Sequence, residues 1–138
     1  MGLGRRKKLA GIISIAASVA MLAVSAPNTA LAHFDDSRVS LSVSDRTVTG
    51  DQKVVFFGRL RNEHNRCVGN EVILLKRRGT GTVARDRTDG DGEFRFRIDP
   101  QPNHGRYFAR YRGKGRFGYA NRHRCGADRS RTIRIRRG

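Results

Sequence analysis

The stretch TDGDGEFRFRI, residues 88–98, decides the fold class of this 138-residue chain. Apolar and charged side chains alternate in its second half, and a period of two places Phe94, Phe96 and Ile98 on one face of an extended strand. The two arginines between them then face water. The first half is rich in Asp and Gly, which accept turn geometry. The sequence therefore predicts a tight turn that leads into a half-buried β-strand.

Alternation of this kind, without helical periodicity, continues through most of the chain after residue 38. The expected strands cover residues 39–44, 53–60, 71–77, 83–87, 93–98, 106–112 and 132–136. Residues typical of turns separate them at 49–51, 79–81, 89–92, 100–103 and 113–115. About seven short strands with frequent turns predict an all-β, antiparallel β-sandwich of two sheets.

The pattern within each strand also predicts which side chains reach the core. Tyr107, Ala109 and Tyr111 share one face of their strand, as do Ile133 and Ile135. Two other segments, residues 54–57 and 72–75, are apolar on both faces, so we expect them to be central strands. Together these residues supply a core just adequate for a small domain, without any Trp.

Residues 1–32 have the organisation of a cleavable secretory signal peptide. Arg5, Arg6, Lys7 and Lys8 precede an apolar run over residues 9–24, and Ala30-Leu31-Ala32 offers small residues to a signal peptidase. The alternative is an uncleaved membrane anchor, which needs a longer apolar run of about 20 residues. Cleavage after Ala32 is expected to leave one domain, residues 33–138. We expect this domain to be released from the cell, or to be held at the cell envelope only by its charge.

The charge of the chain is strongly positive. The full chain has 29 Lys and Arg, 12 Asp and Glu, and a formal net charge of +17. Loss of the four basic residues before the apolar run leaves 25 basic and 12 acidic residues, a net charge of +13. Such a charge attracts polyanions. Most of it comes from Arg, which genomic codon composition alone can enrich.

The two cysteines, Cys67 and Cys125, are expected to form a disulfide, because an exported chain enters an oxidising compartment. A loop of this length corresponds to roughly 4 kcal/mol of stabilisation on the chain-entropy model. The alternative is a zinc site in which His64 and His123 join two reduced thiolates. Export favours the disulfide.

Several motifs resemble carboxypeptidase-regulatory or transthyretin-like domains. They are Gly58-Arg59-Leu60, the run CVGNEVILL at 67–75, the run TDGDGEFRF at 88–96, and Gly105-Arg106-Tyr107. Secreted actinobacterial domains of this kind carry a Cys pair placed like the one here. The resemblance covers roughly residues 52–112, and it implies an Ig-like sandwich that serves as a non-catalytic accessory or adhesive module.

The acidic cluster Asp89, Asp91 and Glu93 has two interpretations. Three carboxylates within five residues provide the oxygen ligands that Ca²⁺ prefers, so they form a weak candidate metal site. The favoured interpretation is a hairpin turn, in which Asp side chains bind nearby backbone N–H groups and Gly92 supplies left-handed geometry. Because no nucleophile or paired carboxylates lie near a base in the sequence, we expect no enzyme activity, catalytic residue or cofactor.

The main candidate site is an anion-binding cluster next to the expected disulfide. It consists of His64, Arg66, Arg122, His123 and Arg124. Guanidinium groups bind phosphate and carboxylate in bidentate fashion, and protonated histidines add charge. Phe117 and Tyr119 lie just before Arg122 in a glycine-rich loop, and they are candidates for stacking on a base or sugar ring.

A second basic surface is expected on the outward faces of three strands, if those strands share a face. Its residues are Arg95, Arg97, Arg110, Arg112, Arg134 and Arg136. The alternative for both basic sets is an ordinary solvated surface.

The sequence thus predicts a secreted, non-enzymatic binding or structural module. The expected partners are anionic polymers, such as a cell-wall polymer, extracellular nucleic acid or an acidic polysaccharide, which basic loops would bind. The alternative is a small secreted factor, inhibitory or toxin-like, that binds another secreted protein.

Overall fold

The computed structural model describes residues 33–99, 104–117 and 123–138. The expected signal peptide, the turn at 100–103, Tyr119 and Arg122 lie outside the described residues. No helix within the described ranges is long and apolar enough to cross a membrane.

The smaller sheet is built around β5 (Val54–Arg61). β8 (Glu93–Ile98) pairs with it in antiparallel fashion, from Val54 opposite Ile98 to Arg59 opposite Glu93. Two short strands, β2 (Arg38–Val39) and β3 (Ser42–Val43), also pair with β5. As predicted from its apolar character, β5 is therefore a central strand.

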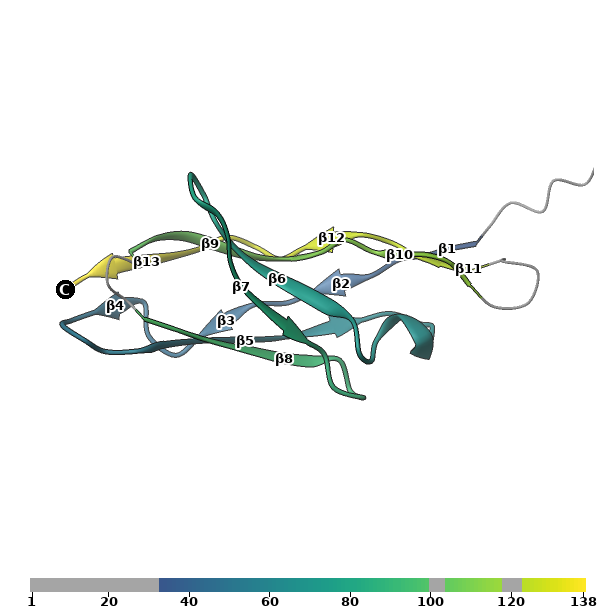
Figure 1. The fold of residues 1–138 in the computed structure, drawn as a ribbon, viewed down its shortest axis with the longest axis horizontal. Coiled ribbons are helices and arrows are strands. Elements are labelled where there is room, and N and C mark those ends of the chain that lie inside the picture. Colours follow the sequence, from purple (N-terminus) through teal and green to yellow (C-terminus); the bar gives the residue numbers. More distant parts are fainter. Residues whose placement is uncertain (1–32, 100–103, 118–122) are drawn as a thin grey trace, which may run out of the picture.

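The larger sheet has the order β4-β13-β9-β6-β7. Its strands are β4 (Thr47–Val48), β13 (Ile133–Arg137), β9 (Gly105–Tyr111), β6 (Val72–Arg77) and β7 (Gly81–Arg87), and β12 (Asp128–Arg129) also pairs with β9. In Figure 1, β9, β12 and β13 run along one side of the elongated molecule and β3, β5 and β8 along the other. This arrangement confirms the predicted all-β sandwich.

A third, three-stranded sheet extends the molecule at the end opposite the C-terminus (Figure 1). It has the order β1 (His33–Asp35), β11 (His123–Cys125) and β10 (Lys114–Phe117). A short 3-10 helix, η1 (Asn65–Cys67), lies next to it. The predicted disulfide between Cys67 and Cys125 is confirmed, and it joins η1 to β11 with a Cα–Cα distance of 5.5 Å.

The predicted strands match the observed ones to within two residues, with one exception. The strand expected at 39–44 is divided into β2 and β3, because the hydroxyl of Ser40 accepts a hydrogen bond from the Arg59 backbone N–H at 3.0 Å and interrupts the regular ladder. Five short strands were not predicted from the sequence: β1, β4, β10, β11 and β12. The predicted pairing was antiparallel throughout, whereas β1 with β11 and β4 with β13 are parallel.

The core forms where the apolar faces of the two sheets meet. All the side chains predicted to point inward from β8, β9 and β13 are buried except Ile98, which is half-buried and packs against the core. The rings of Phe56 and Tyr107 join the sheets, with their centroids 5.0 Å apart. Phe57 and Val72 differ from the expected two-sided burial, since they are 43% and 38% exposed. Both lie on outer sheet faces that no other strand of the described ranges covers.

Gly58 allows the small sheet to pack closely. A Cβ atom at this position would overlap the Ser40 carbonyl oxygen and would lie 2.6 Å from Cζ of Phe94. The Phe94 ring therefore packs over a position that has room only for hydrogen. This packing explains why glycine stands in the middle of a strand, where it otherwise weakens the structure.

Gly58→Ala is expected to lower the free energy of unfolding by about 1–3 kcal/mol, because a side chain there overpacks the sheet. Urea unfolding followed by circular dichroism measures the change. Gly90→Ala is the matched control, since a Cβ at Gly90 meets nothing within 4 Å. Equal effects of the two substitutions would contradict the packing role of Gly58.

The disulfide is expected to contribute about 4 kcal/mol, because it closes a long loop in the unfolded chain; the two cysteines are 58 residues apart. The double variant Cys67→Ser/Cys125→Ser should unfold at a correspondingly lower urea concentration than the oxidised protein. Adding reductant to the wild type should reproduce the loss, and should not affect the variant. An unchanged unfolding midpoint in the variant would disprove this contribution.

Candidate polyanion-binding site

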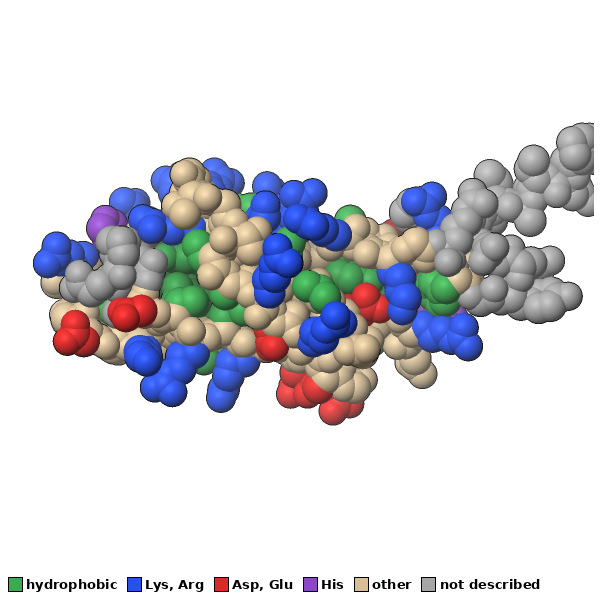
Figure 2. Space-filling model, viewed as in Figure 1, with side chains coloured by type: hydrophobic (Ala, Val, Ile, Leu, Met, Phe, Trp, Pro, Cys, Tyr) green, Lys and Arg blue, Asp and Glu red, His purple; other side chains and the backbone are tan. Residues whose placement is uncertain are grey.

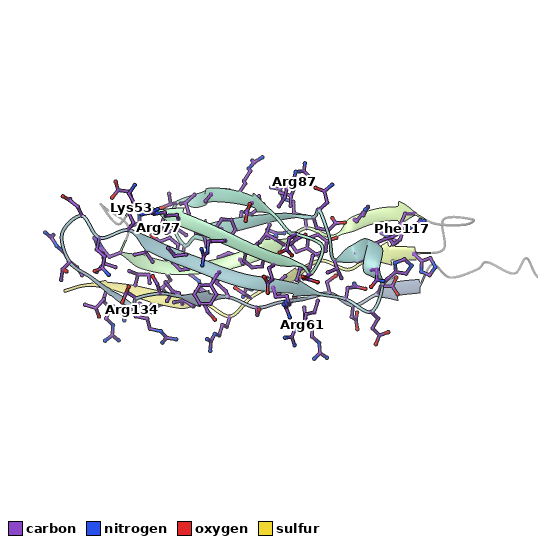
Figure 3. All side chains as sticks on the ribbon, turned by 90° about the horizontal axis from the view of Figure 1, so that it is seen from below. Lys53, Arg61, Arg77, Arg87, Phe117 and Arg134 are labelled. Carbon is purple, nitrogen blue, oxygen red and sulfur yellow. A yellow bond between two sulfur atoms is a disulfide. The ribbon has the colours of Figure 1, made fainter. Side chains whose placement is uncertain are left out.

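The disulfide brings the two predicted anion-binding histidines together. His64 precedes η1, and its Nδ1 accepts a hydrogen bond of 3.2 Å from the backbone N–H of Arg66. The ring of His64 lies 4.7 Å from that of His123 and meets the ring of Phe117 edge-on at 5.1 Å, between centroids. This ring cluster lies at the end of the molecule where Figure 3 labels Phe117. Phe117 thus packs against histidines of the same chain.

The arginines predicted for this cluster lie next to the two cysteines. Arg66 is exposed, whereas Arg124 is half-buried and already interacts with other groups of the protein. Arg122 lies outside the described residues. Within the described part of the cluster, Arg66 therefore contributes the most accessible guanidinium group.

Two carboxylates lie among these basic groups. Asp35 Oδ2 is 3.4 Å from Nδ1 of His123, and both atoms are buried. Oε1 of Glu71 is 3.1 Å from Nζ of Lys114, and the Glu71 side chain is only 10% exposed. Because these carboxylates offset nearby positive charge, this end of the molecule attracts anions less than its basic residues alone would.

Glu71 also acts on the buried hydroxyl of Tyr111. Burial raises the pKa of Tyr111 above its ordinary value of 10.0, and the negative charge of Glu71 raises it further. Burial likewise raises the pKa of Tyr107, although the positive charge of Arg77 opposes this rise. The folded state therefore favours the protonated form of both tyrosines.

The acidic cluster at 89–93 forms the predicted turn. Oδ1 of Asp89 accepts hydrogen bonds from the backbone N–H groups of Asp91 at 2.9 Å and Glu93 at 2.8 Å. Gly92 has a φ of +82°, as the turn requires, and Glu93 forms an ion pair of 2.6 Å with Arg59. These contacts favour the turn interpretation over a calcium loop.

The zinc interpretation of the cysteines is wrong, because both sulfur atoms are used in the disulfide. Within the described parts of the chain, no group of three or more His, Cys, Asp and Glu residues is placed to hold a metal ion.

The outer face of the large sheet carries a second, larger basic set. Alternation along its strands turns every second side chain away from the core. Arg87 also faces outward, opposite Val72, but its guanidinium is used in a hydrogen bond to the Asn70 carbonyl. We call the other basic members of this set the arginine face: Lys76, Arg85, Arg106, Arg110, Arg129, Arg134 and Arg136. All six arginines are exposed. Lys and Arg side chains are spread over the region of β6, β7 and β9 in Figure 2, whereas most Asp and Glu lie in the lower half of the view.

The strand register places like charges of the arginine face next to each other. Arg129 lies directly opposite Arg110, and Arg134 lies directly opposite Arg106. Like charges in directly opposed positions destabilise a sheet. Leu74 faces the same way between Arg110 and Arg85, yet it is only 3% exposed. The aliphatic parts of the neighbouring arginines are long enough to cover it.

No outward position in the described strands of the large sheet holds a carboxylate. Its strands contain two acidic residues, Asp86 and Asp128, and both turn toward the small sheet. Asp86 Oδ2 accepts a hydrogen bond of 2.8 Å from the backbone N–H of Arg95, and Asp128 Oδ2 accepts one of 2.7 Å from that of Val39. The arginine face therefore has unbalanced positive charge.

The structure divides the second predicted basic surface between two sheets. Arg110, Arg134 and Arg136 belong to the arginine face, and Arg112 directly follows β9. Arg95 and Arg97 lie on the other side of the sandwich, because β8 pairs with β5 and not with a strand of the large sheet. The condition that these strands share a face is thus not met by β8.

Four members of the arginine face were not predicted from the sequence: Lys76, Arg85, Arg106 and Arg129. Alternation within 83–87 and 106–112 was a usable signal for Arg85 and Arg106. Arg129 lies in a two-residue strand that has no period to detect.

No family model matches this chain, and no curated protein matches it. The resemblance of its motifs to carboxypeptidase-regulatory or transthyretin-like domains stays a prediction.

The free energy of unfolding is expected to fall as the pH rises above about 10, the ordinary tyrosine pKa. Above this pH, tyrosines of the unfolded chain ionise while Tyr107 and Tyr111 of the folded chain keep their protons, which favours the unfolded state. Below it, the tyrosines are protonated in both states, and no stability is lost. Thermal unfolding from about pH 8 to about pH 11 tests this. Wild type should lose more stability over the range than Tyr111→Phe. Equal losses of stability in wild type and in Tyr111→Phe would exclude a contribution from Tyr111.

Proposed function

We propose that the chain is a secreted, non-enzymatic β-sandwich module that binds an anionic polymer through its arginine face. The observation that carries this proposal is the pairing of like charges in register, Arg129 with Arg110 and Arg134 with Arg106, on a sheet face without carboxylates. A bound polyanion would relieve that repulsion. An anionic partner would therefore stabilise this face more than the disulfide end, where Asp35 and Glu71 already offset positive charge.

The chemistry of the face favours phosphate-bearing polymers. Six of its seven basic residues are arginines, whose planar guanidinium groups bind phosphate in bidentate fashion. Neighbouring positions are separated by about 4.8 Å across strands and about 6.8 Å along them. This regular array suits a polymer with repeated charges better than a single small anion.

Secretion is proposed from the composition of residues 1–32, and the disulfide supports it, since such bonds persist in oxidising compartments. An Ig-like domain of the carboxypeptidase-regulatory kind is proposed from the quoted motifs. The all-β sandwich is compatible with that family, whose members usually serve as accessory modules.

Binding of a fluorescent DNA oligomer and of a polyglycerol-phosphate polymer should weaken as salt increases. The logarithm of affinity falls linearly with that of salt, with a slope of about 0.7–0.9 for each phosphate contact. The triple variant Arg85→Ser/Arg110→Ser/Arg134→Ser should reduce this slope by about 2–3, because it removes three contacts. Fluorescence anisotropy at several salt concentrations gives both slope and affinity.

The matched control is Arg61→Ser/Arg95→Ser/Arg97→Ser, which removes the same charge from the small sheet. Arg61 of this control points outward from one edge of the molecule, opposite Arg87 of the large sheet, so the control acts on a separate surface (Figure 3). The control should leave the slope unchanged. If both triple variants weaken binding equally, net charge and not the arginine face is responsible. If polymer binding is weakened only by the double variant Arg66→Ser/Arg124→Ser, the site lies at the disulfide. Salt-insensitive binding to another secreted protein would instead favour the alternative of a small secreted factor.

A further inference from the structure

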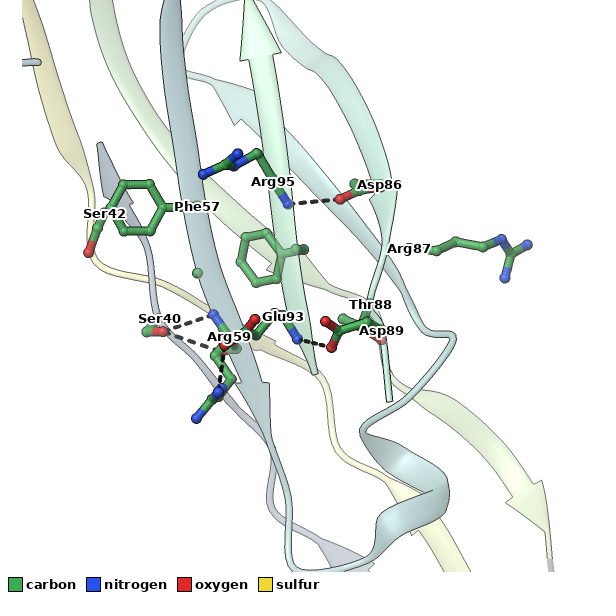
Figure 4. A pocket seen from close by; sticks show the side chains of 12 residues that line it. Ser40, Ser42, Phe57, Arg59, Asp86, Arg87, Thr88, Asp89, Glu93 and Arg95 are labelled. Atoms are coloured by element: carbon green, nitrogen blue, oxygen red, sulfur yellow. Dashed lines mark hydrogen bonds and ion pairs between the residues drawn. The ribbon is translucent and has the colours of Figure 1, made fainter. Parts of the chain in front are cut away.

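A groove of about 650 Å³ crosses the outer face of the small sheet. Its lining comes from β5, from β8, from the end of β7 and from the segment around β3 (Figure 4). Clefts of this size accommodate small ligands or one unit of a larger one. The groove lies on the opposite sheet from the arginine face.

The groove contains an exposed aromatic ring. Phe57 is 43% exposed and lies opposite Arg95 in the β5–β8 ladder. Phe57 and Val72 are the two large hydrophobic side chains that stand out as exposed in the described structure. Phe57 borders this groove, whereas Val72 borders a smaller one of about 340 Å³ on the large sheet. An aromatic ring surrounded by polar groups offers an apolar surface for stacking.

Charges of both signs surround this ring, unlike on the arginine face. Asp86, Asp89 and Glu93 line the groove together with Arg59 and Arg95. Arg87 borders it as well but points away in Figure 4, and its guanidinium donates to the Asn70 carbonyl. An anion would meet three carboxylates here, and a cation would meet Arg95 beside Phe57. The groove therefore suits an uncharged ligand.

The same lining provides hydrogen-bond donors and acceptors in close alternation. Arg59 and Glu93 form an ion pair of 2.6 Å, and Oδ2 of Asp86 accepts a hydrogen bond from the Arg95 backbone N–H. The Arg95 guanidinium points away from Asp86, toward β5 (Figure 4). Neither that guanidinium nor the Ser42 hydroxyl has a hydrogen bond or ion pair among the described residues. Hydroxyl groups both donate and accept, so a polyhydroxylated ligand could use both kinds of group.

We propose that this groove binds a neutral saccharide unit, with the apolar face of the sugar ring stacked on Phe57. Sugar hydroxyls would then bind Arg95, Ser42 and the second oxygen of Glu93 or Asp86. The proposal is independent of polyanion binding, because it concerns the other sheet and an uncharged ligand. The two sites together would let one module contact two kinds of polymer.

Isothermal titration calorimetry with neutral oligomers of glucose, mannose and N-acetylglucosamine tests the proposal. The titrations are made at about 1 M salt, where charges are screened beyond about 3 Å. At least one oligomer should bind with a Kd of about 1 mM or tighter. Phe57→Ala should weaken that binding about tenfold or more, whereas Phe57→Tyr, which keeps the ring, should retain it.

Val72→Ala is the matched control, since it removes an exposed apolar side chain from the other sheet, and it should leave saccharide binding unchanged. Failure of all three oligomers to bind, or equal binding by wild type and Phe57→Ala, would overturn the proposal. So would saccharide binding that weakens strongly with salt, or tighter binding of a carboxylated oligomer than of its neutral counterpart. DNA binding by Phe57→Ala should equal that of wild type, so failure of this proposal is distinguishable from failure of the polyanion site.

Discussion

Each sheet of this protein must bury one face against the other sheet, and that constraint determines where the charge goes. A small domain has few apolar side chains to spare, so every strand must direct them consistently inward. In β8, β9 and β13 the inward positions hold Phe, Tyr, Ala and Ile, and the outward positions hold mostly Arg. The Phe56–Tyr107 contact joins the two layers at the centre. Because the period is two, an arginine next to a core residue is directed outward, and the sandwich acquires two charged outer faces.

The two outer faces then differ because carboxylates are placed on only one of them. On the small sheet, Glu93 pairs with Arg59 across the strands, and Asp89 stabilises the turn that precedes β8. The acidic residues of the large sheet are instead used to hold the layers together, since Asp86 and Asp128 bind backbone N–H groups of the small sheet. One face is left with unbalanced positive charge, and the other with a groove of mixed charge around Phe57. The same folding pattern thus produces surfaces of different chemistry.

Local patterns predicted much of this fold, and non-local pairing accounts for what they missed. Strong alternation located β8 and β13 well, and the two cysteines allowed a single pairing. Strands of two residues, such as β4 and β12, have no period to detect, and a neighbour distant in sequence creates them. The same limit applies to the surfaces: alternation shows that Arg95 and Arg110 face outward, but only the strand order shows that they lie on opposite sheets. The proximity of His64 to His123 followed from the disulfide, whereas Asp35 joined them through a parallel pairing with no local signal.

A bias toward Arg codons accounts for the number of arginines, but it does not account for their surroundings. Such a bias would place carboxylates on both outer faces according to chance, and acidic residues are not rare in this chain, with 12 in all. Direct opposition of Arg106 with Arg134 costs stability, and one Glu at either position would remove that cost. The sheet instead keeps its carboxylates for contacts between the layers. Unbalanced charge at a structural cost is the feature that an anionic partner would explain and that codon composition would not.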